Sequence, residues 1–122
     1  MSGQDSRLLG RWGEALAAEY LRRHRCQVLA SGWRCRQGEI DLIVSDGKYL
    51  AFVEVKLRKS DRYGRAGEFV NARKQMRLRT TAALFLAQNP TELQPRFDVI
   101  EIFAPQGMAT AGPEVNWLKN AF

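Results

Sequence analysis

Residues 38–58, GEIDLIVSDGKYLAFVEVKLR, contain two stretches of β-forming residues that decide how this chain folds. The first stretch covers residues 39–44, with its acids two positions apart, and the second covers residues 49–57, where polar and apolar residues alternate. Asp46 and Gly47 lie between them, and this dipeptide is a strong short-range signal for a tight turn between antiparallel strands. The segment therefore predicts a β-hairpin.

The predicted turn fixes which side chains face each other across the two strands. Asp41 is set opposite Phe52. Because side chains alternate with a period of two, Asp41, Glu54 and Lys56 share one face of the sheet. Asp41 and Glu54 are then diagonal neighbours, with about 7 Å between their Cβ atoms. We therefore expect the two carboxylates to converge on one point, with Glu39 as a third acid on the same face.

Converging carboxylates destabilise a sheet unless a partner neutralises them. A divalent cation is one such partner, because Mg²⁺ takes oxygen ligands from one or two carboxylates and leaves its other positions to water and phosphate. The alternative is an exposed face on which Lys56 pairs with Glu54, a cross-strand ion pair of little energetic consequence. The hairpin by itself is compatible with both arrangements.

Several motifs of the chain resemble a known family. Asp41 and, thirteen positions later, the triplet EVK at residues 54–56 resemble the D…(D/E)-x-K signature of the PD-(D/E)XK nuclease superfamily, with Ile40 in place of the superfamily's proline. The motifs GEALAAEYL, GEIDLI, FVEVK and RFDV, in this order, look like the YraN-like family of small bacterial proteins, which is related in fold to archaeal Holliday-junction resolvases. The match covers residues 10–103. It implies an α/β fold, with a restriction-endonuclease-like αβββαβ core and a mixed central sheet flanked by helices.

The resemblance also implies roles for individual residues. Asp41 and Glu54 would bind Mg²⁺ or Mn²⁺, and Glu14 would complete the metal site, as a first-helix glutamate does in the resolvase-like nucleases. Lys56 would orient or activate the attacking water and stabilise charge on the phosphorane. The expected catalytic residues are therefore Asp41, Glu54, Lys56 and Glu14.

Residues 5–23 predict the first helix, in which Glu14 lies. The apolar positions recur at spacings of three and four and are Leu9, Trp12, Leu16 and Tyr20. Glu14 falls on the other side of the helix, among small residues that allow close packing. The alternative to a metal-site role is a surface glutamate paired with Arg7 or Arg11.

Further elements follow from periodicity and turn residues. Residues 27–30 predict a short strand, which a turn at residues 31–32 ends. Residues 68–88 predict a second helix. Its expected buried positions are Phe69, Ala72, Met76, Ala83 and Ala87. Residues 96–103 predict a strand parallel to the one that holds Glu54, because a strand, a crossover helix and a further strand connect in a right-handed βαβ unit.

The charge of the chain suggests a polyanionic partner. Lysine and arginine number 19 against 13 aspartate and glutamate, which gives a formal net charge of +6. Small basic domains of this kind commonly bind nucleic acid, and phosphate contacts need charge more than rigid geometry. The candidate contacts near the acidic strands are Arg58, Lys59, Arg62, Arg65, Arg73, Lys74 and Arg77. The alternative for the polar stretch after Lys56 is a solvated connection.

The composition bounds the class of protein. The 122 residues are 45% hydrophobic and 26% charged, which is typical of a single globular domain. We expect its core in residues 5–103 and a C-terminal tail in residues 104–122. No run is long and apolar enough to span a membrane, and residues 1–15 lack the apolar segment of a secretory signal, so a cytoplasmic protein is expected. Two cysteines and the single His24 exclude a zinc site of the usual spacing.

Three functions are compatible with these observations. The first is a metal-dependent endonuclease that hydrolyses DNA, with branched or processed DNA as the substrate and a homodimer as the assembly that kinship with resolvases suggests. The second is a nucleic-acid-binding module that has the fold without the chemistry. The third is a basic domain that binds an acidic protein. Asp41, Glu54 and Lys56 on one face favour the first, because an inactive module has no chemical reason to keep them together.

Overall fold

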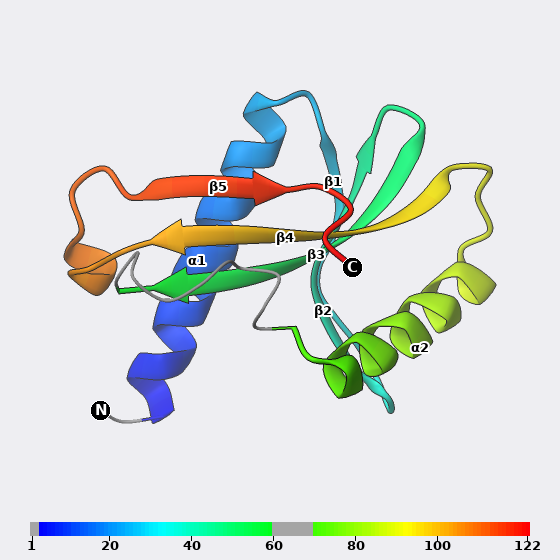
Figure 1. Cartoon of the computed structure of the whole chain (residues 1–122), viewed down its shortest axis with the longest axis horizontal. Coiled ribbons are helices and arrows are strands. Elements are labelled where there is room, and N and C mark those ends of the chain that lie inside the picture. Colours follow the sequence, from blue (N-terminus) through cyan, green and yellow to red (C-terminus); the bar gives the residue numbers. More distant parts are fainter. Residues whose placement is uncertain (1–2, 60–69) are drawn as a thin grey trace.

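The computed structural model describes residues 3–59 and 70–122 of the chain. Within these residues the chain forms a five-stranded sheet, two α-helices and one short 3-10 helix (Figure 1). In chain order the elements are α1 (Gly3–Arg23), β1 (Gln27–Cys35), β2 (Gly38–Asp46), β3 (Tyr49–Arg58), α2 (Ala72–Gln88), β4 (Gln94–Phe103), η2 (Gly107–Ala109) and β5 (Glu114–Leu118). Neither α-helix in the described ranges combines the length and apolar character that crossing a membrane requires.

The sheet is mixed, and its strands lie in the order β1-β2-β3-β4-β5. β3 and β4 are parallel, with α2 between them in the chain, whereas the other neighbouring pairs are antiparallel. The predicted parallel pairing of residues 96–103 with the Glu54 strand is confirmed. Helices flank this mixed sheet, which gives the restriction-endonuclease-like core expected from the sequence (Figure 1). β5, from the C-terminal tail, adds an edge strand beside β4.

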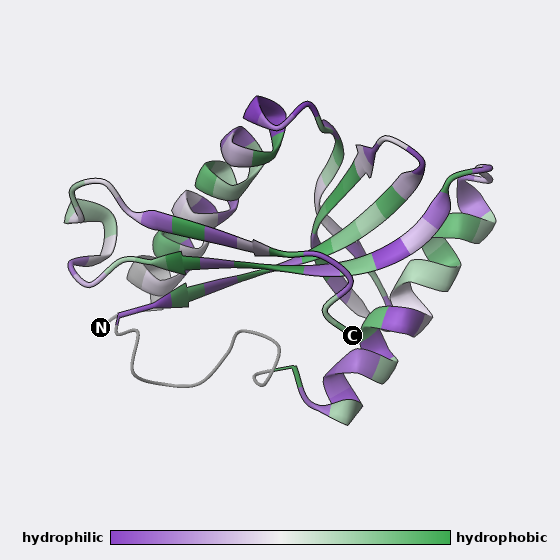
Figure 2. Cartoon of the chain, turned by 45° about the horizontal axis from the view of Figure 1, so that its top comes forward, coloured by the Kyte–Doolittle hydropathy of each residue, from purple (hydrophilic) through white to green (hydrophobic). Residues whose placement is uncertain are grey.

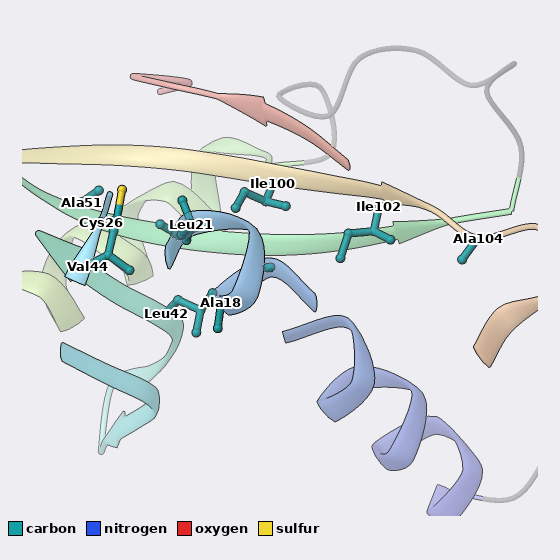
Figure 3. Close-up of a cluster of buried hydrophobic side chains, with 11 residues drawn as sticks. Ala18, Leu21, Cys26, Leu42, Val44, Ala51, Ile100, Ile102 and Ala104 are labelled. Atoms are coloured by element: carbon teal, nitrogen blue, oxygen red, sulfur yellow. The ribbon is translucent and has the colours of Figure 1, made fainter. Parts of the chain in front are cut away.

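One core lies between the sheet and α1. Small residues let this helix approach the strands closely, since a Cβ added to Gly13 would lie only 3.1 Å from the Leu57 side chain. Figure 3 labels nine buried members of this core: Ala18, Leu21, Cys26, Leu42, Val44, Ala51, Ile100, Ile102 and Ala104. The small-residue side of the predicted helix is therefore its buried face, and Trp12 and Leu16 pack against the core while partly exposed.

The second core lies on the other face of the sheet, against α2. Because side chains alternate along a strand, Ile43 and Phe52 belong to this core while their neighbours in β2 and β3 belong to the first. Phe85 of α2 packs edge-on against Phe52 and Trp33, with ring centroids 6.0 and 5.3 Å apart. These aromatic contacts set which side of α2 faces the sheet.

The buried side of α2 differs from the predicted one. The helix buries Leu78, Thr81, Ala82 and Phe85. Of the positions expected to be buried, Met76 is 70% exposed, Ala72, Ala83 and Ala87 are exposed, and Phe69 lies outside the described residues. The prediction was wrong because small and apolar residues occur on several sides of this helix, so spacing alone does not identify the side that meets the aromatic rings.

Two details of the strands also differ from the predictions. Residues 31–32 form no turn, because β1 continues past them to Cys35 with a bulge between Val28 and Ala30. In the hairpin, Asp46 pairs with Tyr49, and Ile43 pairs with Phe52 where the predicted register paired it with Leu50. The observed register thus differs from the predicted one by two residues. Because side chains alternate with a period of two, a change of two residues leaves each side chain on the predicted face of the sheet.

A buried polar network joins β4 to the turn of the hairpin and to the C-terminal tail. The Asp98 carboxylate is fully buried and accepts two hydrogen bonds of 2.8 Å from the Arg96 guanidinium. It also accepts hydrogen bonds from the Trp117 indole at 3.0 Å and from the Asn120 amide at 2.9 Å. Arg96 donates a further hydrogen bond of 2.7 Å to Asp46 at the end of β2.

Replacement of Asp98 by alanine should strongly destabilise the protein. The substitution leaves the buried Arg96 guanidinium without the carboxylate that accepts two of its hydrogen bonds, and removing one partner of a buried ion pair costs about 3–5 kcal/mol in the free energy of unfolding. Urea denaturation of Asp98→Ala measures this loss. Glu19→Ala is the matched control, because its pair with Arg23 is exposed and should contribute little. Equal stabilities of the two variants would contradict the assignment.

Candidate functional site

The strands β2 and β3 separate part-way along their length. Residues 42–46 of β2 pair with residues 49–53 of β3. Beyond this point residues 38–40 remain paired with β1, whereas residues 54–58 remain paired with β4. In Figure 1 the end of β2 that is paired with β1 runs towards α2, while β3 continues alongside β4. We call the point of separation, after Leu42 and Val53, the fork.

Asp41 and Glu54 are the first residues of β2 and β3 beyond the fork. The Asp41 carboxylate lies between the strands, where its Oδ2 accepts a 2.8 Å hydrogen bond from the Val55 amide. Because the last paired residues are Leu42 and Val53, Asp41 and Glu54 are each the next residue along their own strand, whereas the predicted register set Asp41 opposite Phe52. Glu54 is only 7% exposed. The structure therefore brings together the two carboxylates expected to hold a metal.

Two lysines neutralise these acids. Lys74 of α2 forms an ion pair with Glu54, with 2.6 Å between Nζ and Oε1. Burial and the hydrogen-bonded Lys74 ammonium lower the pKa of Lys56, against the opposing effect of Glu54 and Asp41. Burial also acts to lower the pKa of Lys74, but the hydrogen bonds to Glu54 and Lys56 and the charges of Glu54 and Asp41 together outweigh it and raise that pKa. Of the two amines, Lys56 is the one whose proton is more easily lost.

The pKa of the Asp41 carboxyl is strongly shifted at the fork. Burial raises its pKa to about 7, and the charge of Glu54 acts in the same direction. The hydrogen bond from the Val55 amide and the charge of Lys74 oppose this rise without cancelling it. An additional positive charge beside Asp41 would favour the ionised form of its carboxylate.

Glu14 reaches the same region from α1. Burial raises its pKa, and the charges of Glu39 and Glu54 add to the effect, while Arg11 and Arg34 oppose it. Glu14 is therefore in electrostatic contact with the fork, although in residues 3–59 and 70–122 no three acidic, histidine or cysteine side chains are close enough to bind one metal ion together. Asp41 and Glu54 are therefore the candidate metal ligands. Their carboxylate oxygens are hard donors of the kind that fit Mg²⁺ or Mn²⁺, with the remaining positions on the ion left to water or phosphate.

Two hollows meet at Asp41. The smaller, about 210 Å³, lies between the fork and α2, and Glu54, Lys74 and Arg77 line it. The larger, about 840 Å³, lies between α1 and the β1–β2 hairpin, and Glu14 lines it. Asp41 lines both hollows, so a molecule in either one can reach its carboxylate.

The predicted nucleic-acid contacts fall into three groups. Hydrophilic residues cover much of the first half of α2 (Figure 2), where Arg73 and Arg77 are exposed and Lys74 is partly exposed. Lys59 is exposed at the end of β3, whereas Arg58 is not a surface contact, since its side chain is 9% exposed and pairs with Glu101 at 2.6 Å. The remaining two predicted contacts, Arg62 and Arg65, lie outside the described residues.

Sequence analysis missed the arginines of the larger hollow as a group. Arg7, Arg11 and Arg22 of α1 and Arg34 of β1 line it. The sequence suggests Arg34, beside the acidic strand, as a phosphate contact or a solvated residue, but it does not suggest the three arginines of α1 as contacts. The signal was present in the spacing, because positions 7, 11, 14, 18 and 22 follow one side of a helix. Arg7 and Arg11 had been considered only as surface partners for Glu14.

Comparison with known proteins assigns the chain to a family. Residues 13–102, which include the acids and lysines of the fork, match the model of the uncharacterised protein family UPF0102. The chain belongs to this family. UPF0102 is the YraN family that the four sequence motifs indicated, so that prediction is confirmed.

Several UPF0102 proteins are similar to this chain over most of their length. The relative from Symbiobacterium thermophilum is 50% identical over 98 residues, which cover 80% of this chain and 83% of the relative. The relative from Frankia casuarinae is 44% identical and covers 93% of this chain and 95% of its own. The relative from Pseudomonas aeruginosa is 40% identical, with 98% and 95% covered. The similarity thus extends from α1 through the C-terminal tail.

The raised pKa of Asp41 predicts how the stability of this UPF0102 protein depends on pH. The carboxyl has an ordinary pKa of 3.8 and a folded-state pKa of about 7, so the unfolded chain loses this proton first as the pH rises. The contribution of Asp41 to the free energy of unfolding therefore falls as the pH rises from about 4 to about 7. Asp41→Asn should remove this fall, so its stability relative to the wild type should be greater at about pH 8 than at about pH 4. Urea denaturation across this range measures the difference.

Asp46→Asn is the control with the opposite sign. Burial acts to raise the pKa of Asp46, but Arg96 and Lys119 outweigh it and lower that pKa. Asp46 therefore stabilises the fold above its ordinary pKa of 3.8, and Asp46→Asn should lose stability as the pH rises from the acid range. Parallel pH profiles for Asp41→Asn and the wild type would contradict the environment assigned to Asp41.

Proposed function

We propose that this UPF0102 protein is a metal-dependent endonuclease that hydrolyses DNA phosphodiester bonds at the fork. The observation that supports the proposal best is the proximity of a half-buried carboxylate, Asp41, and a buried one, Glu54, with Lys56 and Lys74 beside them. The hydrogen bond from the Val55 amide gives Asp41 a structural role, but it does not explain why a second acid, Glu54, lies at the same point. Following the resemblance to resolvase-like nucleases, the expected substrate is branched or processed DNA.

Asp41 and Glu54 would hold Mg²⁺ or Mn²⁺. When bound, such an ion polarises a phosphoryl oxygen and lowers the pKa of an attacking water. Glu14, in electrostatic contact with Glu54, would add negative charge on the α1 side of the site. Lys74 can transfer its ion pair from Glu54 to a substrate phosphate, because its side chain is 30% exposed and lines the smaller hollow.

Lys56 would act on the attacking water. Its lowered pKa leaves more of the amine unprotonated near neutral pH than in an ordinary lysine, so that it can accept a proton, and a position two residues after Glu54 keeps it on the same face as the acids. In its protonated form it would stabilise the charge that develops on the phosphorane. The exposed Arg73, Arg77 and Lys59 would hold the backbone of the DNA near the site. A homodimer stays a prediction.

A second function is a nucleic-acid-binding module without catalysis. The observation that favours it is the ion pair between Lys74 and Glu54, because it neutralises one of the acids without a metal. In such a module the fork would be a structural feature, and the basic residues would bind phosphate with no turnover. The two functions differ in metal binding and in cleavage.

The discriminating measurement is cleavage of labelled linear, flapped and four-way-junction DNA with Mg²⁺, Mn²⁺ or EDTA. The variants are Glu54→Gln, which keeps the shape of the side chain, and Lys56→Met, which keeps its length. Each should lower the cleavage rate at least about 100-fold, because each removes a group that acts in the transition state. Calorimetric titration should also show that Glu54→Gln weakens binding of Mg²⁺.

Glu92→Gln is the matched control, because Glu92 is an exposed acid that lines neither hollow. It should cleave and bind metal like the wild type, and loss of cleavage in Glu54→Gln and Lys56→Met purified in the same way excludes a contaminating nuclease as the source of activity. Binding of DNA in EDTA with no cleavage under any condition would reject catalysis and leave the binding module.

A further inference from the structure

The hollow between α1 and the β1–β2 hairpin has a wall of arginines. Arg7, Arg11 and Arg22 line it from α1, and Arg34 lines it from β1. All four side chains are exposed, and Arg34 is 78% exposed with only a 3.5 Å ion pair to Glu39. Arg7, Arg11 and Arg22 form no ion pair with another described residue, so their charges are available to a ligand.

The three helical arginines follow one side of α1. Positions 7, 11, 14, 18 and 22 are spaced by three or four residues, which places them in a line along the helix. Glu14 and Ala18 occupy the line between Arg11 and Arg22 and also line the hollow. At about 1.5 Å per residue, the line from Arg7 to Arg22 is about 22 Å long.

The acids of this hollow are Glu14, Glu39 and Asp41, and they belong to the electrostatic group at the fork. Arg7 and Arg22 lie towards the two ends of the line, on either side of Glu14. The α1 side of the hollow therefore carries positive charge on both sides of Glu14, and the proposed catalytic acid Asp41 also lines the hollow. That distribution suits an extended chain of phosphates with one phosphate directed to the fork.

We infer that the groove between α1 and β1 binds the backbone of the nucleic acid, with Arg7, Arg11, Arg22 and Arg34 contacting phosphates and Asp41 at the point where the groove meets the site. The inference rests on the proposed function, and it adds a binding surface on the α1 side to the one expected from α2. A length of about 22 Å spans about six nucleotide steps of one strand of B-DNA, in which phosphates recur about every 3.4 Å along the axis.

There is free space beside Gly10 on the side of α1 that lines the groove. A Cβ added to this residue meets nothing within 4 Å, and Gly10 lies one residue before Arg11 on α1. A larger side chain at this position can therefore project into the groove without disturbing the packing of the helix. This provides a way to fill the groove that does not alter its charge.

The first test measures the salt dependence of duplex DNA binding in EDTA. Each arginine that contacts a phosphate contributes about 0.9 to the slope of the logarithm of affinity against the logarithm of salt concentration. The variant Arg7→Ala/Arg11→Ala/Arg22→Ala should therefore lose about 2.7 from this slope, and Arg22→Ala alone about 0.9. Arg23→Ala is the matched control, since Arg23 is the next residue of α1, carries the same charge and pairs with Glu19 outside the groove.

The second test fills the groove. Gly10→Leu should weaken DNA binding by about tenfold, as the loss of one charge-assisted contact would give. Gly10→Ala is its matched control, because a methyl group leaves the groove open, and it should bind DNA like the wild type. Both substitutions should raise the melting temperature, since glycine is unfavourable inside a helix. A melting temperature at or above that of the wild type shows that weakened binding is not unfolding.

The outcomes separate this inference from the proposed function. Equal slopes for Arg22→Ala and Arg23→Ala, together with unchanged binding by Gly10→Leu, would overturn the groove even if the protein cleaves DNA. Loss of slope and affinity in the groove variants, in a protein that cuts no substrate, would support the groove and reject catalysis. Failure of the wild type to bind any nucleic acid, with binding to an acidic protein instead, would overturn both.

Discussion

The hydrogen bond from the Val55 amide to the Asp41 carboxylate is the constraint on which the rest of the site depends. β2 and β3 pair regularly as far as Leu42 and Val53, and beyond them an amide of β3 donates to a side chain of β2. A backbone donor at a place where strands separate needs such an acceptor, because a buried amide without a partner is costly. The same bond that satisfies the backbone therefore fixes the first acid of the site in position.

Each helix then brings one charged side chain to that point by a local feature of its sequence. Gly13 lets α1 approach Leu57 closely, and this proximity carries the neighbouring Glu14 towards the strands. Asn71 caps α2 by accepting a hydrogen bond from the amide of Lys74, so the first turn of the helix is ordered where Lys74 meets Glu54. The proposed site thus depends on the fork between β2 and β3, on the close approach of α1 to the sheet and on the cap of α2. Its neighbouring acids repel each other, which destabilises the folded state at the place where chemistry is proposed.

Much of this arrangement could be predicted from the sequence, and the exceptions have physical causes. The alternation of residues placed Asp41, Glu54 and Lys56 on one face of the sheet. The predicted hairpin register was wrong by two residues, but a change of two residues does not move a side chain to the other face. The right-handed crossover placed β4 correctly beside β3. These rules act within one strand or one connection, so they need no knowledge of the rest of the fold.

The errors concern contacts between elements distant in the sequence. The side of α2 that meets the sheet is set by Phe85 against Trp33 and Phe52, and no spacing within the helix reveals those partners. The spacing of Arg7, Arg11 and Arg22 on one side of α1 is visible in the sequence, but that they line a groove depends on β1, which lies opposite. The network around Asp98 likewise depends on residues of the C-terminal tail.

The sharing of Asp41 between two hollows has an electrostatic consequence. Lys74 and Arg77 line the hollow beside α2, whereas Arg7, Arg11, Arg22 and Arg34 line the one beside α1. One acidic residue thus lies at the boundary between two basic surfaces that belong to different helices. A change in the charge of Asp41 therefore alters the electrostatic potential of both hollows at the same time.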